Sequence, residues 1–125
     1  MKSDGIVVST SGGSTAYSYS AGGPIIDPSI DSVVITPIAP FSKFPRSIVL
    51  PSSTEINIGI DTPKYNKAEK DVNFDVFLDG VLVTDLNNKK DNTTLFKIIK
   101  KDRTVKILGL DNQVNVNEFL SQILR

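Results

Sequence analysis

The side chains best suited to binding a ligand are gathered near the N-terminus, in residues 4–27. An aspartate precedes a short apolar run, a loop of serine, threonine and glycine follows it, and Ser-Thr-Ala-Tyr comes next. A carboxylate accepts hydrogen bonds, hydroxyl groups donate and accept them, and glycine lets a ligand approach the backbone closely. The stretch therefore predicts a ligand-binding site. A tight turn that binds nothing is the alternative, because loops of glycine and serine are common.

Two short elements must position this loop. Residues 6–8 are β-branched and predict a buried strand. Ser14 is placed to cap a short helix over residues 15–21, and Gly22-Gly23-Pro24 is placed to end it. The start of such a helix offers free N–H groups to an anion or a carbonyl group.

Composition limits the chemistry and the partners. The chain has 125 residues, which fits one domain over 1–125, and its 14 basic and 14 acidic residues give no net charge. Binding to nucleic acid or to an anionic membrane is therefore not expected. Cysteine and histidine are absent, which excludes disulfides, thiolate nucleophiles, imidazole bases and metal sites built on these residues.

The apolar runs are too short to span a membrane and the N-terminus does not resemble a signal peptide, so we expect a cytoplasmic location. The rest of the chain alternates short apolar runs with turns of proline, glycine and asparagine, which is typical of a mainly β sandwich. The last segment has the spacing of a short amphipathic helix. The expected strands are 32–36 (closed by Pro37), 47–50, 55–61, 72–79 with 81–83 after an Asp-Gly turn, and 94–99 paired with 104–108; a loop is expected at 62–71 and the helix at 117–124.

The order of residues 4–27 resembles the signature of the NAD kinase family. The shared pattern is Asp-Gly, three apolar residues, Ser-Thr, two small residues, Gly-Ser-Thr-Ala-Tyr, two residues and Ser-Ala-Gly-Gly-Pro-Ile. The family loop usually reads Ser-Thr-Pro-Thr-Gly-Ser-Thr-Ala-Tyr, so Ser11 stands here for the proline and Gly12 for the next hydroxyl residue. A second family block matches Thr-Pro-Ile-Ala-Pro at residues 36–40, and Val81 stands where the family has a polar residue after a later Asp-Gly.

The resemblance implies the β-sandwich-like C-terminal domain of the NAD kinase fold, with short helices near the N-terminal motif and at the C-terminus. NAD kinases phosphorylate the adenosine 2′-hydroxyl of NAD with ATP or polyphosphate and so make NADP. Their N-terminal α/β domain carries a Gly-Gly-Asp-Gly motif with the catalytic aspartate, and an Asn-Glu pair holds the adenosine. Gly-Gly-Asp-Gly does not occur in these 125 residues. The family's Asn-Glu pair lies before the signature, whereas the Asn-Glu pair of this chain is at residues 117–118, far beyond it. We therefore expect no catalytic residue in this chain, no kinase activity from it alone, and Mg²⁺ or another divalent metal only in a full-length enzyme.

The resemblance also implies the NAD-binding residues. Asp4 would orient the dinucleotide, and Tyr17 would pack its flat ring on a nucleotide; a core tyrosine is the alternative. Tyr19 lies on another face of the expected helix and is expected to be a packing residue. The expected binding residues are Asp4, Gly12, Ser14, Thr15, Ala16, Tyr17, Ser20 and Ala39, with no metal ligand among them. The expected partners are NAD and ATP or polyphosphate, and a second copy of the chain in a homodimer or homotetramer.

Two other functions remain open from the sequence. One is a non-catalytic β-sandwich that binds a nucleotide or only oligomerises. The other is the β-domain of a lipid kinase of the diacylglycerol or sphingosine type, which shares the two-domain plan. The Gly-Ser-Thr-Ala-Tyr block favours NAD over a lipid.

Overall fold

The protein is described by a computed structural model that covers residues 3–41, 46–59, 74–83 and 95–102. These ranges hold seven short strands and one helical segment, so the mainly β class is confirmed. The chain divides into two compact units. Unit 1 comprises Met1–Thr54 and Lys100–Arg125, and unit 2 comprises Glu55–Ile99; each is described by itself. No helix in the described ranges is long and apolar enough to cross a membrane.

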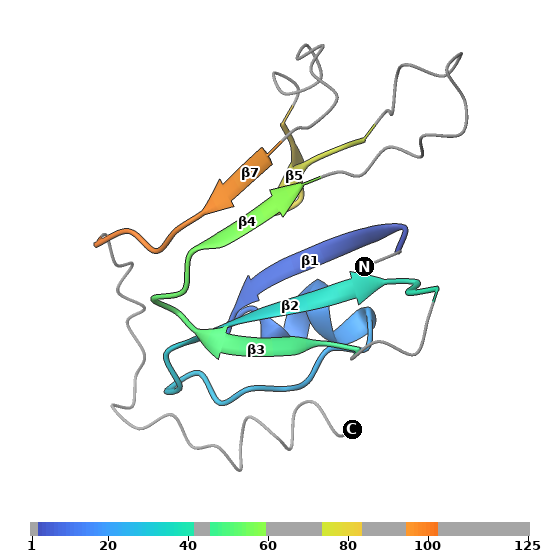
Figure 1. Ribbon diagram of the computed structural model, residues 1–125. Coiled ribbons are helices and arrows are strands. Elements are labelled where there is room, and N and C mark those ends of the chain that lie inside the picture. Colours follow the sequence, from blue (N-terminus) through green and yellow to red (C-terminus); the bar gives the residue numbers. More distant parts are fainter. Residues whose placement is uncertain (1–2, 42–45, 60–73, 84–94, 103–125) are drawn as a thin grey trace, which may run out of the picture. The chain divides into compact units, whose positions relative to one another are not determined.

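Unit 1 is built on an antiparallel sheet of three strands in the order β1-β2-β3 (Figure 1). The strands are β1 (Gly5–Thr10), β2 (Ser32–Ile38) and β3 (Ile48–Pro51). Gly5 pairs with Ile38 and Thr10 with Val33, so β1 lies along almost all of β2. On β2 the residues Ser32, Val34 and Thr36 are buried. Because alternate residues of a strand share one face, these three side chains define the covered face of the sheet.

β2 runs through Pro37, so the prediction that this strand closes there is wrong. The reason lies in its neighbours. β3 pairs with Ser32–Ile35, and beyond that point no described strand pairs with β2 on that side. Proline, which lacks an N–H, is tolerated at a sheet edge.

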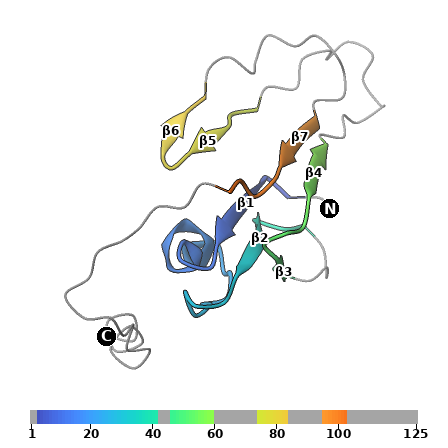
Figure 2. The ribbon, with the colours of Figure 1, turned by 90° about the vertical axis from the view of Figure 1, so that its left-hand side faces the viewer.

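The helical segment η1 (Ser14–Ser18) follows β1 and lies against one face of the sheet (Figure 2). It is of the wide π type and continues as ordinary helix over Tyr19 and Ser20, so the predicted helix exists within one residue of its expected bounds. Ala16 interrupts it with non-helical backbone angles (φ −91°, ψ −129°). Gly13 is its N-cap residue and makes no side-chain capping bond, so the prediction of a Ser14 cap is wrong.

The end of the helix is the one that the sequence predicts. Gly22 has a positive φ of 87°, which glycine adopts without steric cost. Its N–H donates to the carbonyl of Tyr19 (2.9 Å), and the N–H of Gly23 donates to the carbonyl of Ser18 (2.8 Å). This pair of bonds is a Schellman motif, which satisfies carbonyl groups at a helix end that have no donor within the helix.

Unit 2 contains two strand pairs. β4 (Ile56–Gly59) pairs with β7 (Leu95–Ile98), and β5 (Phe77–Leu78) pairs with β6 (Val81–Leu82), both antiparallel. We predicted a partner for β7 at 104–108, which lies outside the described residues; the partner observed is β4. The rings of Phe74 and Phe96 meet edge to face with centroids 5.6 Å apart, a favourable aromatic geometry.

The Asp79-Gly80 hairpin is confirmed. Both residues have positive φ (47° and 81°), as a two-residue type I′ turn requires. The strand before it is shorter than predicted: residues 74–76 are irregular, although the carbonyl of Val76 still accepts a bond from the N–H of Val83 (2.8 Å). The predicted loop at 62–71 and helix at 117–124 lie outside the described residues.

Candidate functional site

The predicted binding residues begin at one end of β1. Asp4 is exposed, and its N–H donates to the carbonyl of Ile38 (3.0 Å), so it lies beside Ala39 at the end of β2. Ala39 is also exposed and has a positive φ of 46°, an uncommon backbone conformation for alanine. The sheet therefore brings together two residues that are 35 positions apart in the chain.

The Ser/Thr/Gly loop lies at the other end of β1. Gly12 is exposed and follows Thr10, the last residue of the strand. From Asp4 to Thr10 the strand extends about 20 Å, at roughly 3.3 Å per residue. A ligand that touches both ends of β1 must therefore be long.

The helix η1 returns from the loop toward Asp4. A Cβ atom on Gly13 would lie 3.5 Å from Ser9, at the loop end of β1. Ser18 contacts Thr36, which pairs with Val7 in the middle of β1. The segment that carries Thr15, Ala16, Tyr17 and Ser20 therefore lies between the two ends of the candidate site.

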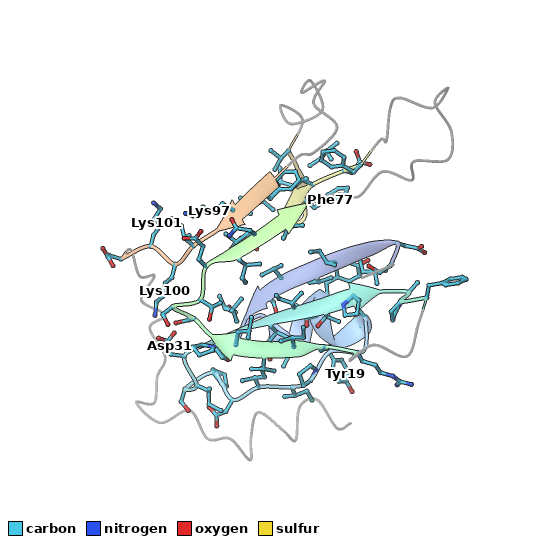
Figure 3. The ribbon with its side chains drawn as sticks, viewed as in Figure 1. Tyr19, Asp31, Phe77, Lys97, Lys100 and Lys101 are labelled. Carbon is cyan, nitrogen blue, oxygen red and sulfur yellow. The ribbon has the colours of Figure 1, made fainter. Side chains whose placement is uncertain are left out.

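Tyr17 projects from the protein surface, with 61% of its area exposed. The alternative of a core tyrosine is thereby excluded, and the ring is free to stack on a planar group. Ala16 and Ser20 are exposed as well, and Thr15 is half-buried. Tyr19, the C-cap residue of η1 (labelled in Figure 3), is 46% exposed, so the expected packing role is met by about half of its surface at most.

Ser14 is the one predicted binding residue that is fully buried. Its Oγ accepts a hydrogen bond from the N–H of Ile26 (3.1 Å) and donates to the carbonyl of the same residue (3.4 Å). Both capacities of the hydroxyl are used within the protein. Ser14 therefore fixes the helix to the segment that precedes β2.

The helix start offers fewer free N–H groups than the sequence predicts. The N–H of Gly13 donates to the carbonyl of Thr10 (3.1 Å), that of Ser14 to Ser11 (3.1 Å) and that of Ala16 to Gly13 (3.2 Å). These three amides are satisfied by backbone carbonyls and are not available to an anion.

A cluster of buried hydroxyl groups lies beneath η1 and has no counterpart among the predicted site residues. Ser18 Oγ lies 2.9 Å from Thr36 Oγ1, which lies 3.2 Å from Ser47 Oγ. Ser18 and Thr36 are buried, and Ser47 is half-buried. We call Ser18, Thr36 and Ser47 the hydroxyl cluster. The four-residue spacing of Ser14 and Ser18, which places both on one helix face, is the signal that could have identified it.

Two carboxylates of unit 1, Asp27 and Asp31, take part in hydrogen bonds at the surface. Lys100 Nζ donates to Asp31 Oδ2 (2.7 Å) and to Ser52 Oγ (3.1 Å), as Figure 3 shows for the ion pair. The hydrogen bond from Lys100 lowers the pKa of Asp31, with a further contribution from Ser52. The pKa of Asp27 is lowered by hydrogen bonding from Ser29, whose N–H lies 2.8 Å from Oδ1. Neither carboxylate is raised toward the pKa of a general base.

No group of three or more acidic, histidine or cysteine side chains within the described ranges could hold a metal ion.

Comparison with known proteins identifies the family. Residues 1–107 match the family model of the ATP-NAD kinase C-terminal domain. The NAD kinase of Clostridium beijerinckii is 36% identical over 123 residues, which cover 98% of this chain and 39% of that protein. The NAD kinase of Methanosarcina barkeri is 50% identical over 64 residues, which cover 51% of this chain and 23% of that protein.

A solved structure agrees with the sequence comparison. The crystal structure of yeast NADH kinase complexed with NADH superposes with a TM-score of 0.71 at 31% identity, covering 95% of this chain and 35% of that one. The chain thus spans less than half the length of the relatives that it matches. From its sequence and its fold, this chain belongs to the family of ATP-NAD kinase C-terminal domains.

Proposed function

We propose that this chain is the NAD-binding part of a kinase that transfers a phosphoryl group from ATP or polyphosphate to the adenosine 2′-hydroxyl of NAD. The observation that carries the proposal is the family match together with the exposure of Tyr17 within the matching signature. A dinucleotide is a long ligand with two planar bases, and the candidate site offers an exposed aromatic ring between two ends about 20 Å apart.

Each exposed residue has a role in this proposal. The Asp4 carboxylate accepts hydrogen bonds from ribose hydroxyls and so orients the dinucleotide. Tyr17 stacks on a base of the dinucleotide. The other expected binding residues shape the surface along which the dinucleotide lies: Gly12, Thr15, Ala16, Ser20 and Ala39. Ser14 acts indirectly, since its hydroxyl is occupied by Ile26.

The chemical step belongs to residues outside this chain. Phosphoryl transfer needs a phosphate cradle, a metal that bridges the donor phosphates and a base for the accepting hydroxyl. Among the described residues there is no group of three or more acidic side chains that could hold a metal ion, and the pKa values of Asp27 and Asp31 are lowered, not raised. We therefore propose that this chain binds and orients NAD, that a Gly-Gly-Asp-Gly domain provides the base and the donor site, and that the enzyme works with Mg²⁺ in the cytoplasm.

The comparisons favour neither alternative function, the lipid kinase or the non-catalytic sandwich. The test is a chimaera in which this chain replaces the 123 matching residues of the Clostridium beijerinckii NAD kinase. We expect NADP to form from NAD, ATP and Mg²⁺ with the chimaera, and not with this chain alone. A folded chimaera that makes no NADP would contradict the proposal, as would turnover on the order of 1 s⁻¹ by the chain alone.

We also propose that the chain forms a homodimer or homotetramer. Large apolar side chains are exposed in both units: Phe41, Ile48 and Val49 in unit 1, and Phe77, Leu78, Val81 and Leu82 in unit 2. Exposed apolar surface of this kind favours association. Sedimentation equilibrium measures it, and a monomer at high concentration would contradict it.

A further inference from the structure

The helix η1 is held to the sheet by hydroxyl groups. Its buried residues are Ser14 and Ser18, one turn apart, and no apolar side chain of Ser14–Ser18 is buried. Ser14 is bonded to the backbone of Ile26 and Ser18 to the side chain of Thr36. Hydrogen bonds are directional, whereas apolar contacts are not, so these two attachments fix the orientation of the helix.

The opposite side of the same helix carries the proposed NAD contacts. Ala16, Tyr17 and Ser20 are exposed, while Ser18 between them is buried. The backbone at Ala16 is not helical, so a continuous ladder of helix bonds does not set the direction of Tyr17. The direction of its ring depends on where Ser14 and Ser18 are attached.

Thr36 is the fixed end of the second attachment. It is fully buried in β2, and its Oγ1 contacts the hydroxyls of both Ser18 and Ser47. Gly23 closes over the same point, since a Cβ atom there would lie 2.6 Å from Thr36 Oγ1. The helix, its C-terminal turn and the central strand therefore meet at one hydroxyl group.

We propose that Thr36, acting through Ser18, is a positioning residue for NAD binding. The inference rests on the proposed function. Thr36 touches no ligand; its hydroxyl holds Ser18 in place, and Ser18 in turn sets the position of Tyr17 and Ser20. Loss of the hydroxyl lets the helix shift on the sheet and misaligns the NAD contacts, while the binding of ATP is unaffected.

The experiment compares Thr36→Val with Thr36→Ser in the chimaera described above. Valine has nearly the shape of threonine without its hydroxyl, whereas serine keeps the hydroxyl and loses the methyl group. We expect Thr36→Val to raise the KM and the dissociation constant for NAD about tenfold, the equivalent of one lost buried hydrogen bond. Thr36→Ser should restore both to within about twofold, and the KM for ATP should not change in either variant.

A control separates positioning from stability. Ile56 is buried in β4 of unit 2 and takes no part in the hydrogen bonds of Ser14 and Ser18, so we expect Ile56→Val to lower the melting temperature and to leave those bonds in place. We expect this variant to bind NAD as the unsubstituted chimaera does. If Thr36→Val is insoluble, Ser18→Ala removes the same hydrogen bond from the helix side and is judged in the same way.

The outcomes distinguish the two proposals. An unsubstituted chimaera that folds but makes no NADP overturns the proposed function and this inference with it. An active chimaera in which Thr36→Val leaves the KM for NAD unchanged, or in which Thr36→Ser raises it as much as valine does, overturns the inference alone.

Discussion

The helix η1 and the β5–β6 hairpin distribute their side chains in opposite ways. The helix buries Ser14 and Ser18 and exposes Tyr17 and Tyr19. The hairpin exposes all four residues of its strands, which are Phe77, Leu78, Val81 and Leu82. Its turn is closed by residues adjacent in the chain, whereas the contact of Ser18 with Thr36 spans 18 positions. The hairpin is therefore specified locally, and the helix depends on a distant strand.

The glycines of the two regions show the same difference. Gly80 is required for its positive φ, and a Cβ atom added there would meet nothing within 4 Å. Gly23 has no such backbone requirement, but a Cβ atom there would lie within 2.7 Å of three atoms. Space is limiting at Gly23, whereas backbone conformation is limiting at Gly80, as it is at Gly22 in the helix end.

The largest effect is expected for Gly23→Ala. The new methyl group would meet Ser18 Oγ at 2.5 Å and Thr36 Oγ1 at 2.6 Å and separate the two hydroxyls. Overpacking together with a broken buried hydrogen bond should cost about 3 kcal/mol of unfolding free energy, measured by urea denaturation. Gly12→Ala is the control, since the nearest atom to its Cβ is Thr10 Oγ1 at 3.9 Å. Equal losses in the two variants would show that the space beneath η1 is not limiting.

The exposed face of η1 should respond in binding and not in stability. Tyr17→Ala removes an exposed ring and should raise the KM for NAD of the chimaera about tenfold or more, as should Asp4→Asn, which removes a charged acceptor. The melting temperature should change little, because both side chains are exposed. Tyr19→Ala, on the same helix and also exposed, is the control and should leave the KM unchanged. If Tyr17→Ala and Asp4→Asn lower the melting temperature and leave the KM for NAD unchanged, these residues serve stability and not NAD binding.

A smaller effect is expected at the hairpin turn. Gly80→Ala places a Cβ atom in the left-handed region and should cost about 1 kcal/mol of unfolding free energy. Asp79→Asn should cost almost nothing, because Asn-Gly is equally favoured in a type I′ turn. Thermal denaturation of the two variants measures the difference. If Gly80→Ala lowered the unfolding free energy as much as Gly23→Ala does, the contrast between the hairpin and the helix would not hold.

The smallest effect is expected at the exposed Asp31–Lys100 pair. The pKa of Asp31 is lower in the folded chain than in the unfolded one, so its contribution is present above about pH 4 and is lost as the pH falls through the folded pKa. As the pH falls, the melting temperature of Asp31→Asn should therefore decrease slightly less than that of the unsubstituted chain. Added salt should make this difference smaller, because it screens the exposed ion pair. Identical pH profiles for the variant and the unsubstituted chain would show that the pair does not contribute.

Local signals account for what the sequence predicted correctly. The existence of β1, the Gly22-Gly23 helix end and the Asp79-Gly80 turn each depend on a few neighbouring residues. The predicted burial of residues 6–8 is wrong, since all three are half-buried in β1. The errors arose where a distant partner decided the outcome. Pro37 stays in β2 because the described pairing of β3 ends at Ile35. The pairing of β7 with β4 is likewise between segments far apart in the chain, and the sequence did not indicate it.

The site shows the same limit. The signature located the exposed residues, from Asp4 to Ser20, but Ser14 was misassigned. Serine is favoured both as a helix cap and as a buried hydrogen-bonding group, and only the position of Ile26 decides between them. Thr36 gave no signal beyond its place in a strand, because its role depends on Ser18 and Gly23.

The hydroxyl cluster also limits the directions of its own O–H groups. Each hydroxyl carries a single proton, so Thr36 can donate to Ser18 or to Ser47 but not to both. Either oxygen of each pair can be the donor, so at least one of the two hydrogen bonds is donated to Thr36, by Ser18 or by Ser47. Because Ser18 and Thr36 are buried and Ser47 is half-buried, Ser47 is the member of the cluster that can exchange a hydrogen bond with water.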